Sequence, residues 1–194
     1  MNIFQILMLG ISLYFAYQVY LHVTNLEDFP QKDSEKEKIK KPLSIVDPEY
    51  LVNRADEAYE AGNTAEALRL LREAHAKDSE NTDILNKLGF VLAKEGELEE
   101  AVSSYLDSLE RNSEDDTVHN AIASVYRNLG DTDASRKHYE EALRIDDEYA
   151  ITYFNFANLL VDLQELEKAK EMYQKAIDLD PEFTQAKFEL EKLK

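Results

Sequence analysis

The 194-residue sequence contains no cysteine and no tryptophan, and it has only five glycines and four prolines. The absence of cysteine excludes disulfides, thiolate metal sites, a cysteine nucleophile and a lipid-modified cysteine anchor. Basic residues are also scarce, because 22 Lys and Arg stand against 40 Asp and Glu, for a formal net charge of -18. Such a charge repels phosphate backbones, so we expect no nucleic-acid partner.

The longest uncharged run lies at the N-terminus. Residues 3–23 read IFQILMLGISLYFAYQVYLHV. As a helix rising about 1.5 Å per residue they would span about 31 Å, the thickness of a bilayer's hydrocarbon core. No Lys or Arg precedes the run and bulky residues end it, which disfavours a cleaved signal peptide. A buried helix of a soluble core is a second alternative. We predict an uncleaved transmembrane helix over residues 1–23, with residues 3–23 in the membrane.

A polar segment follows the apolar run. Residues 24–47, TNLEDFPQKDSEKEKIKKPLSIVD, combine mixed charges with two prolines and few large apolar side chains. They bury too little apolar surface to offset the entropy of ordering, so we expect a flexible charged linker. Lysines at positions 32, 36, 38, 40 and 41 favour a cytoplasmic C-terminal domain by the positive-inside rule. A solvated linker would also explain these lysines, and Glu27 and Asp28 lie closer to the membrane segment.

From Pro48 the chain can be laid out without gaps at a period of 34 residues. The four registers are 48–81, 82–115, 116–149 and 150–183. The eighth position is always small: Ala55, Gly89, Ala123 and Ala157. The fifteenth holds three turn glycines and one exception: Gly62, Gly96, Gly130 and Gln164. The twenty-fourth is large: Leu71, Tyr105, Tyr139 and Tyr173. Positions 20 and 27 are again small.

This pattern resembles the tetratricopeptide repeat family, in tandem over about seven-tenths of the chain. The resemblance implies an all-α fold, an α-solenoid of four helix-turn-helix repeats with a C-terminal capping helix at residues 184–194, preceded by the one transmembrane helix. The sequence departs from the family pattern locally. No repeat has the family's Trp at position 4, Gln164 replaces a turn glycine, and Ser135 stands where Ala is usual.

The repeat also has a physical interpretation. Apolar residues at helical spacing give each helix one buried face, and small residues at positions 8, 20 and 27 let helices approach closely. Glycine at position 15 predicts a left-handed turn, where Gln164 should cost some stability. We expect Leu190, Leu193 and Phe188 to cover the last repeat.

Motifs for catalysis or metal binding are missing from the sequence. The four histidines lack H-E-x-x-H or any other ligand spacing, and the carboxylate runs lack the alternating ligands and central glycine of an EF-hand. There is no glycine-rich phosphate loop. We therefore expect no enzyme, no cofactor and no metal site, and a function that depends on binding.

By resemblance, the family lines its concave face with positions 2, 5, 9 and 12 of each first helix. The candidate partner-binding residues at these positions are Tyr59, Asn86, Phe90, Asn120, Ser124, Arg127, Phe154 and Asn158. The asparagines are interpreted as a ladder that can hydrogen-bond a peptide backbone, the aromatic residues as apolar pockets, and the arginine as a carboxylate ligand. The alternative is ordinary solvent-facing residues, or inter-repeat packing for the two phenylalanines.

The resemblance also bears on the choice of partner. One family subclass clamps the C-terminal carboxylate of chaperones with Lys and Asn at positions 5 and 9 of the first repeat, but this sequence has Val52 and Asp56 there. From residue 48 onward, 34 of the 40 acidic and 17 of the 22 basic residues occur, so a basic protein or peptide partner is favoured. We predict a single-pass membrane adaptor, or alternatively a self-associating, homo-oligomeric platform.

Overall fold

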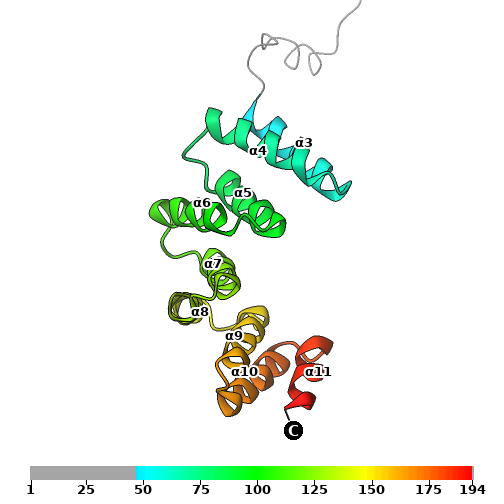
Figure 1. The fold of residues 1–194 in the computed structure, drawn as a ribbon, viewed down its shortest axis with the longest axis vertical. Coiled ribbons are helices and arrows are strands. Elements are labelled where there is room, and N and C mark those ends of the chain that lie inside the picture. The colour runs from blue at the N-terminus through cyan, green and yellow to red at the C-terminus, as the bar shows by residue number, and fades with distance from the viewer. Residues whose placement is uncertain (1–46, 194) are drawn as a thin grey trace, which may run out of the picture. The chain divides into compact units, whose positions relative to one another are not determined.

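A computed structural model of the chain describes residues 47–193. Over this range the protein forms nine α-helices and no strand, arranged as four antiparallel pairs and one last helix (Figure 1). The helices are α3 (Pro48–Glu60), α4 (Thr64–Lys77), α5 (Thr82–Glu95), α6 (Leu98–Arg111), α7 (Asp116–Leu129), α8 (Thr132–Ile145), α9 (Ala150–Asp162), α10 (Leu166–Leu179) and α11 (Thr184–Lys192). The all-helical repeat solenoid predicted from the sequence is confirmed, and each pair begins at the first residue of a 34-residue register.

No helix among residues 47–193 combines the length and apolar character that a membrane span requires. The predicted transmembrane segment lies outside the described residues, as does the predicted linker up to residue 46.

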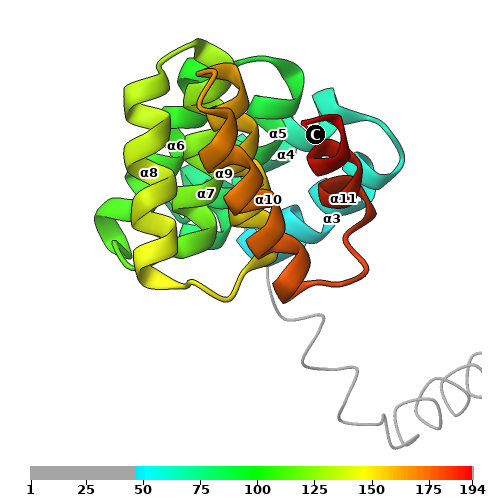
Figure 2. The same ribbon diagram turned by 90° about the horizontal axis from the view of Figure 1, so that it is seen from below.

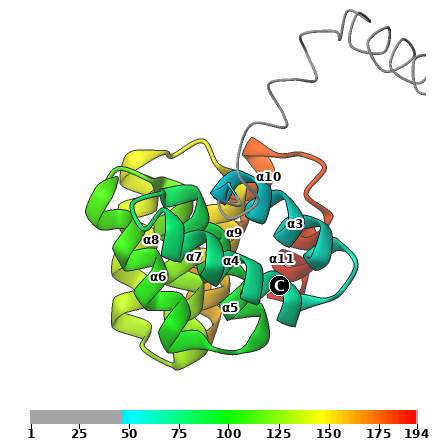
Figure 3. The ribbon, with the colours of Figure 1, turned by 90° about the horizontal axis from the view of Figure 1, so that it is seen from above.

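The helices of the repeat domain form two layers. Each helix packs against its partner, the second helix of a pair contacts the first helix of the next, and α5 and α9 both also contact α7. Figure 2, seen from the α11 end, shows α6 and α8 on the outside with α7 and α9 nearer the middle. Figure 3 gives the view from the α3 end. The first helices therefore make up the inner layer, which carries all the predicted partner-binding residues.

Small residues pack where the helices of a pair come closest. The four residues at position 20 are completely buried: Ala67, Ala101, Ser135 and Ala169. Ser135, which departs from the family pattern, donates its hydroxyl to the carbonyl of Ala123 on the partner helix, 2.8 Å away. Its buried polar group is therefore satisfied, and serine is tolerated at an alanine position.

The four turns at position 15 share one geometry. Gly62, Gly96 and Gly130 have φ between 76° and 83°, and Gln164 follows with φ 61°, the one positive value of a non-glycine residue over residues 47–193. In every case the next residue donates its N–H to the carbonyl five residues earlier, as Glu165 does to Leu160 at 2.9 Å. This is the Schellman closure of a helix. The left-handed turn predicted from the glycines is confirmed, and Gln164 adopts it without glycine's freedom.

The last helix covers the fourth repeat differently from our expectation. Ala186 is completely buried, and Leu190 and Leu193 are partly buried on the same helix face. The prediction that Phe188 covers the repeat was wrong, because its side chain is 62% exposed. Two residues correspond to about 200° of helix rotation, so Phe188 points away from the face that Ala186 buries. Phe183, at the start of α11, packs on the repeat in its place.

Candidate partner-binding site

Three of the eight predicted residues meet in one pocket between α3 and α5. Tyr59, Asn86 and Phe90 line a cavity of about 290 Å³, together with Ala55 and Val91. The Tyr59 and Phe90 rings meet edge to face, with centroids 5.4 Å apart and planes at 65°. Phe90 remains 43% exposed. An exposed aromatic wall on a largely apolar hollow is typical of a site that takes an apolar side chain.

One ion pair and one further lysine lie at this pocket. Lys87 on α5 donates to both carboxylate oxygens of Asp56 on α3, at 3.0 and 3.1 Å. Lys94 lies 5.4 Å from the centroid of the Phe90 ring, within cation–π range. The Asp56–Lys87 pair is partly exposed and adds little stability by itself. The negative charge of Asp56 is thus balanced by Lys87 at this pocket.

The three predicted asparagines differ in what their carbonyl oxygens do. Asn120 Oδ1 accepts from Asn155 Nδ2 on α9 at 3.1 Å, and Asn158 Oδ1 accepts from the Tyr173 hydroxyl. Asn86 Oδ1 is buried and has no partner among the described residues. Asn86 is the counterpart of Asn120 one repeat earlier. The counterpart of Asn155 is then residue 121, an alanine, which has no amide to donate.

The amide nitrogens of these asparagines remain available. Within residues 47–193, no hydrogen bond engages Nδ2 of Asn86, Asn120 or Asn158. Each Nδ2 carries two N–H donors. The inner layer therefore presents donors, whereas the ladder interpretation expected these side chains both to donate and to accept. Asn155, which holds Asn120 in place, was missed because it occupies position 6, outside the four positions considered.

Ser124 and Arg127 are engaged within the repeats. The Ser124 hydroxyl donates to the backbone carbonyl of Asn120 at 3.1 Å and lies 2.9 Å from the Tyr139 hydroxyl. Arg127 donates through Nε to Asp162 on α9, and this hydrogen bond raises the pKa of the guanidinium above its ordinary value. A carboxylate ligand would compete with Asp162 for Arg127.

Phe154 also makes contacts within the fold. Its ring lies 4.9 Å from that of Phe183 and 5.7 Å from that of Tyr173, centroid to centroid. These contacts join α9 to α10 and to the start of α11. Phe154 is therefore packed against residues of its own repeat, 150–183, and not of a neighbouring one, while Phe90 keeps an exposed ring.

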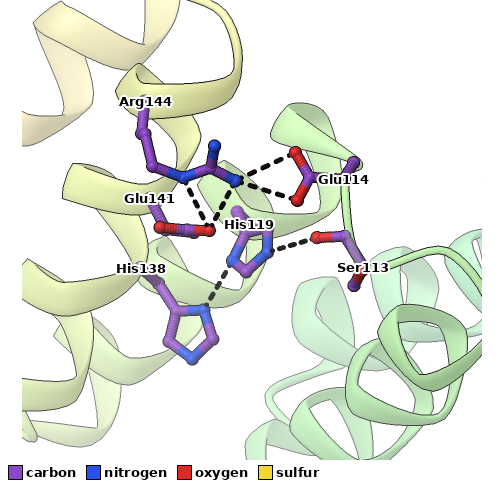
Figure 4. A network of polar contacts seen from close by, with 6 residues as sticks. All are labelled: Ser113, Glu114, His119, His138, Glu141 and Arg144. Carbon is purple, nitrogen blue, oxygen red and sulfur yellow. Dashed lines mark hydrogen bonds and ion pairs between the residues drawn. The ribbon is translucent and has the colours of Figure 1, made fainter.

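Two histidines with no recognisable spacing in the sequence are in contact in the structure. His119 on α7 and His138 on α8 place their Nδ1 atoms 3.0 Å apart, and His119 Nε2 lies 3.2 Å from the Ser113 carbonyl (Figure 4). Because His119 Nε2 must donate to that carbonyl, its neutral ring accepts at Nδ1, and His138 Nδ1 is the donor. Burial, followed by the electrostatic effect of His119, lowers the pKa of His138 to about 4.

An ion-paired cluster lies beside the histidines. Arg144 joins Glu141 of its own helix to Glu114 in the loop between α6 and α7, at 2.9 Å from each (Figure 4). Over residues 47–193, no group of three or more His, Cys, Asp or Glu side chains is arranged to hold a metal ion. The histidine pair is therefore a feature of repeat 3 that connects α7 to α8.

Comparisons with known proteins identify the repeat family. A family model described as tetratricopeptide repeat matches residues 81–148 and 115–182, which together make up more than half of the chain. The chain belongs to the tetratricopeptide repeat family. Proteins of this family generally act as protein-interaction modules. A search of curated protein sequences finds no match.

Several solved structures share the fold of this tetratricopeptide repeat protein. MamA (residues 41 to the end) from Desulfovibrio magneticus RS-1 is 23% identical, with a TM-score of 0.67 over 75% of this chain and 82% of that one. YrrB, described as a protein with an unusual peptide-binding site, is 23% identical, with a TM-score of 0.64 over 72% of each chain. The first repeat domain of Spaghetti (RPAP3), bound to the HSP90 peptide SRMEEVD, is 25% identical, with a TM-score of 0.56 over 60% of this chain and 92% of that one.

Proposed function

We propose that this protein is a membrane-anchored adaptor that holds an extended segment of another protein along the inner layer of its repeats. Membership of the family supports binding in place of catalysis. Two of the similar structures, YrrB and the RPAP3 domain, are described with a peptide-binding site or a bound peptide. In this proposal the apolar run at residues 3–23 supplies the anchor, and the lysines after it favour a cytoplasmic repeat domain.

The observation that carries the proposal is the set of free amide donors on the first helices. Asn86, Asn120 and Asn158 have no internal acceptor for Nδ2 among the described residues, while an extended peptide presents backbone carbonyls that need donors. The pocket at Tyr59 and Phe90 adds a place for a side chain. Backbone contacts from the asparagines would supply affinity, and the pocket would supply specificity.

Replacing a side-chain amide by a carboxylate removes the N–H donors and keeps an oxygen acceptor, so it tests the donors alone. Asn120→Asp keeps an oxygen for Asn155 and removes the free N–H donors. We would select binding peptides from a random display library with the full chain, and measure the affinity of the selected peptides in about 1 M salt, where the Debye length is about 3 Å and added charge is screened. We expect weaker binding to Asn120→Asp. Gln185→Glu, an exposed exchange of the same kind on α11, should bind as wild type does.

Equal affinity of the Asn120→Asp variant and the wild type would refute donation by the ladder. The side of the membrane on which the repeat domain lies is tested by protease accessibility in intact cells, with a C-terminal epitope tag; protection until the membrane is opened is the expected result.

The alternative, a self-associating platform, is favoured by the exposed Phe188 on the last helix. Mass that rises with concentration, and that falls back in Phe188→Glu, would support it.

A further inference from the structure

The groove between α3 and α5 holds a second pocket beside the aromatic one. This second pocket, of about 380 Å³, lies at the start of α3 and at the loop before α5, and four carboxylate residues line it: Asp47, Glu49, Asp78 and Asp83. Among the described residues, no Lys, Arg or His lines it. The groove is therefore polar and acidic at one end, and aromatic at the other.

Three of these four carboxylates have no ion-pair partner in the described part of the chain. Within residues 47–193, Glu49, Asp78 and Asp83 form no ion pair, although Asp78 accepts a hydrogen bond from Asn81. Most Arg and Lys side chains of this range are already paired with other carboxylates. Asp56, near the aromatic pocket, has its own cation in Lys87. The negative potential of the groove is thus concentrated at the end that Glu49 and Asp83 mark.

The spacing of the two pockets sets the spacing of a ligand. Glu49 and Asp56 are seven residues apart on α3, which corresponds to about 10 Å along the helix. In a polyproline II segment, side chains three residues apart lie on the same side and are about 9 Å apart. One extended segment can therefore place a cationic side chain in the acidic pocket and an apolar one against Tyr59 and Phe90.

We propose that the partner of the α3–α5 groove is an extended peptide with Lys or Arg three residues from a large apolar side chain. This rests on the proposed function and narrows it to one ligand class. The cation is favoured by charge complementarity with Glu49 and Asp83, and the apolar residue by the exposed aromatic wall. A peptide that ends in acidic residues, of the kind bound to the RPAP3 domain, would meet Glu49 and Asp83 with like charge.

The test is selection from a random dodecapeptide display library against the full chain at about 0.15 M salt. We expect enrichment of Lys or Arg three residues from Leu, Ile, Met or an aromatic residue. A selected peptide should bind Glu49→Gln/Asp83→Asn at least about fivefold more weakly. Phe90→Ala should lose the preference for the apolar residue and keep that for the cation. Glu99→Gln/Glu140→Gln removes two exposed, unpaired carboxylates on second helices and should bind as wild type does.

Different failures have different meanings. Enrichment of acidic peptides, or equal weakening by the two double variants, would overturn this inference and leave the adaptor proposal standing. Selected peptides whose affinity is insensitive both to Asn120→Asp and to the α3–α5 variants would overturn both, as would a library without any enriched sequence.

Discussion

Gly89→Ala tests the close contact between the two helices of repeat 2. A Cβ atom at Gly89 would lie 2.9 Å from Cε1 and Cζ of Tyr105, a distance at which one of the groups must move. Tyr105 is only 4% exposed, so its ring has little space to move into. The other repeats accept alanine here. In repeat 3 the Tyr139 hydroxyl is held by Ser124, but in repeat 2 the corresponding residue is Phe90, which offers no hydrogen bond.

Two opposing effects set the magnitude. Alanine in place of glycine inside a helix stabilises by about 1 kcal/mol, while overpacking of a core costs about 1–3 kcal/mol. We expect Gly89→Ala to lower the free energy of unfolding by about 1 kcal/mol. In a Tyr105→Leu background, which reproduces the Ala55–Leu71 pair of repeat 1, the same change should stabilise by up to about 1 kcal/mol.

The two backgrounds are compared by urea denaturation followed through helical circular dichroism, with the slope of each transition checked against that of the parent. The sign of the Gly89→Ala effect should reverse between them. If Gly89→Ala stabilised both backgrounds equally, the Tyr105 ring would not limit the space at residue 89, and the packing argument would fail.

Two further predictions concern a turn and a histidine. Gln164→Gly should stabilise by about 1 kcal/mol, because φ of 61° strains any residue with a Cβ; a lower thermal midpoint would contradict this. In the folded protein the pKa of His138 is lowered to about 4, whereas in the unfolded chain it has its ordinary value of about 6.5. Below pH 6.5 the unfolded chain therefore binds more protons than the folded protein. Stability should therefore fall between pH 6.5 and 5, by at most about 2 kcal/mol, and urea midpoints should show a weaker fall in His138→Gln. Equal falls would argue against the pair.

The fold could be predicted because its information is local and repeated. A gap-free period fixes where helices begin, and small residues at fixed positions determine which faces meet, as the burial of Ala67 and Ala101 shows. The periodic pattern also indicated the turn at Gln164 despite the missing glycine. It did not fix the outward direction of Phe188, because a short last helix has no following repeat to restrict which face it buries.

The contacts of the candidate site were harder to predict, since they join side chains of different helices, and in some cases of different repeats. His119 and His138 are 19 residues apart and have no ligand spacing, so only the packing of α7 on α8 brings them together. The Arg127–Asp162 pair spans 35 residues. Positions on an inner helix predict which residues face inward. They do not predict whether a neighbouring repeat already supplies a partner.

The inner layer is divided by this internal pairing. In repeat 3, Ser124 and Arg127 already have partners in Tyr139 and Asp162. In repeat 4, Asn158 accepts from Tyr173 and Phe154 packs on Phe183, so ligands of these two repeats would find mainly amide donors. In repeat 1, position 24 is Leu71, which has no hydroxyl to donate. In repeat 2, position 24 is Tyr105, whose ring lies against Gly89, and Phe90 stays exposed. Side-chain recognition should therefore be concentrated at the α3–α5 end, while the later repeats hold the backbone. A partner segment that binds both regions would gain affinity along the whole stack and specificity at its first groove.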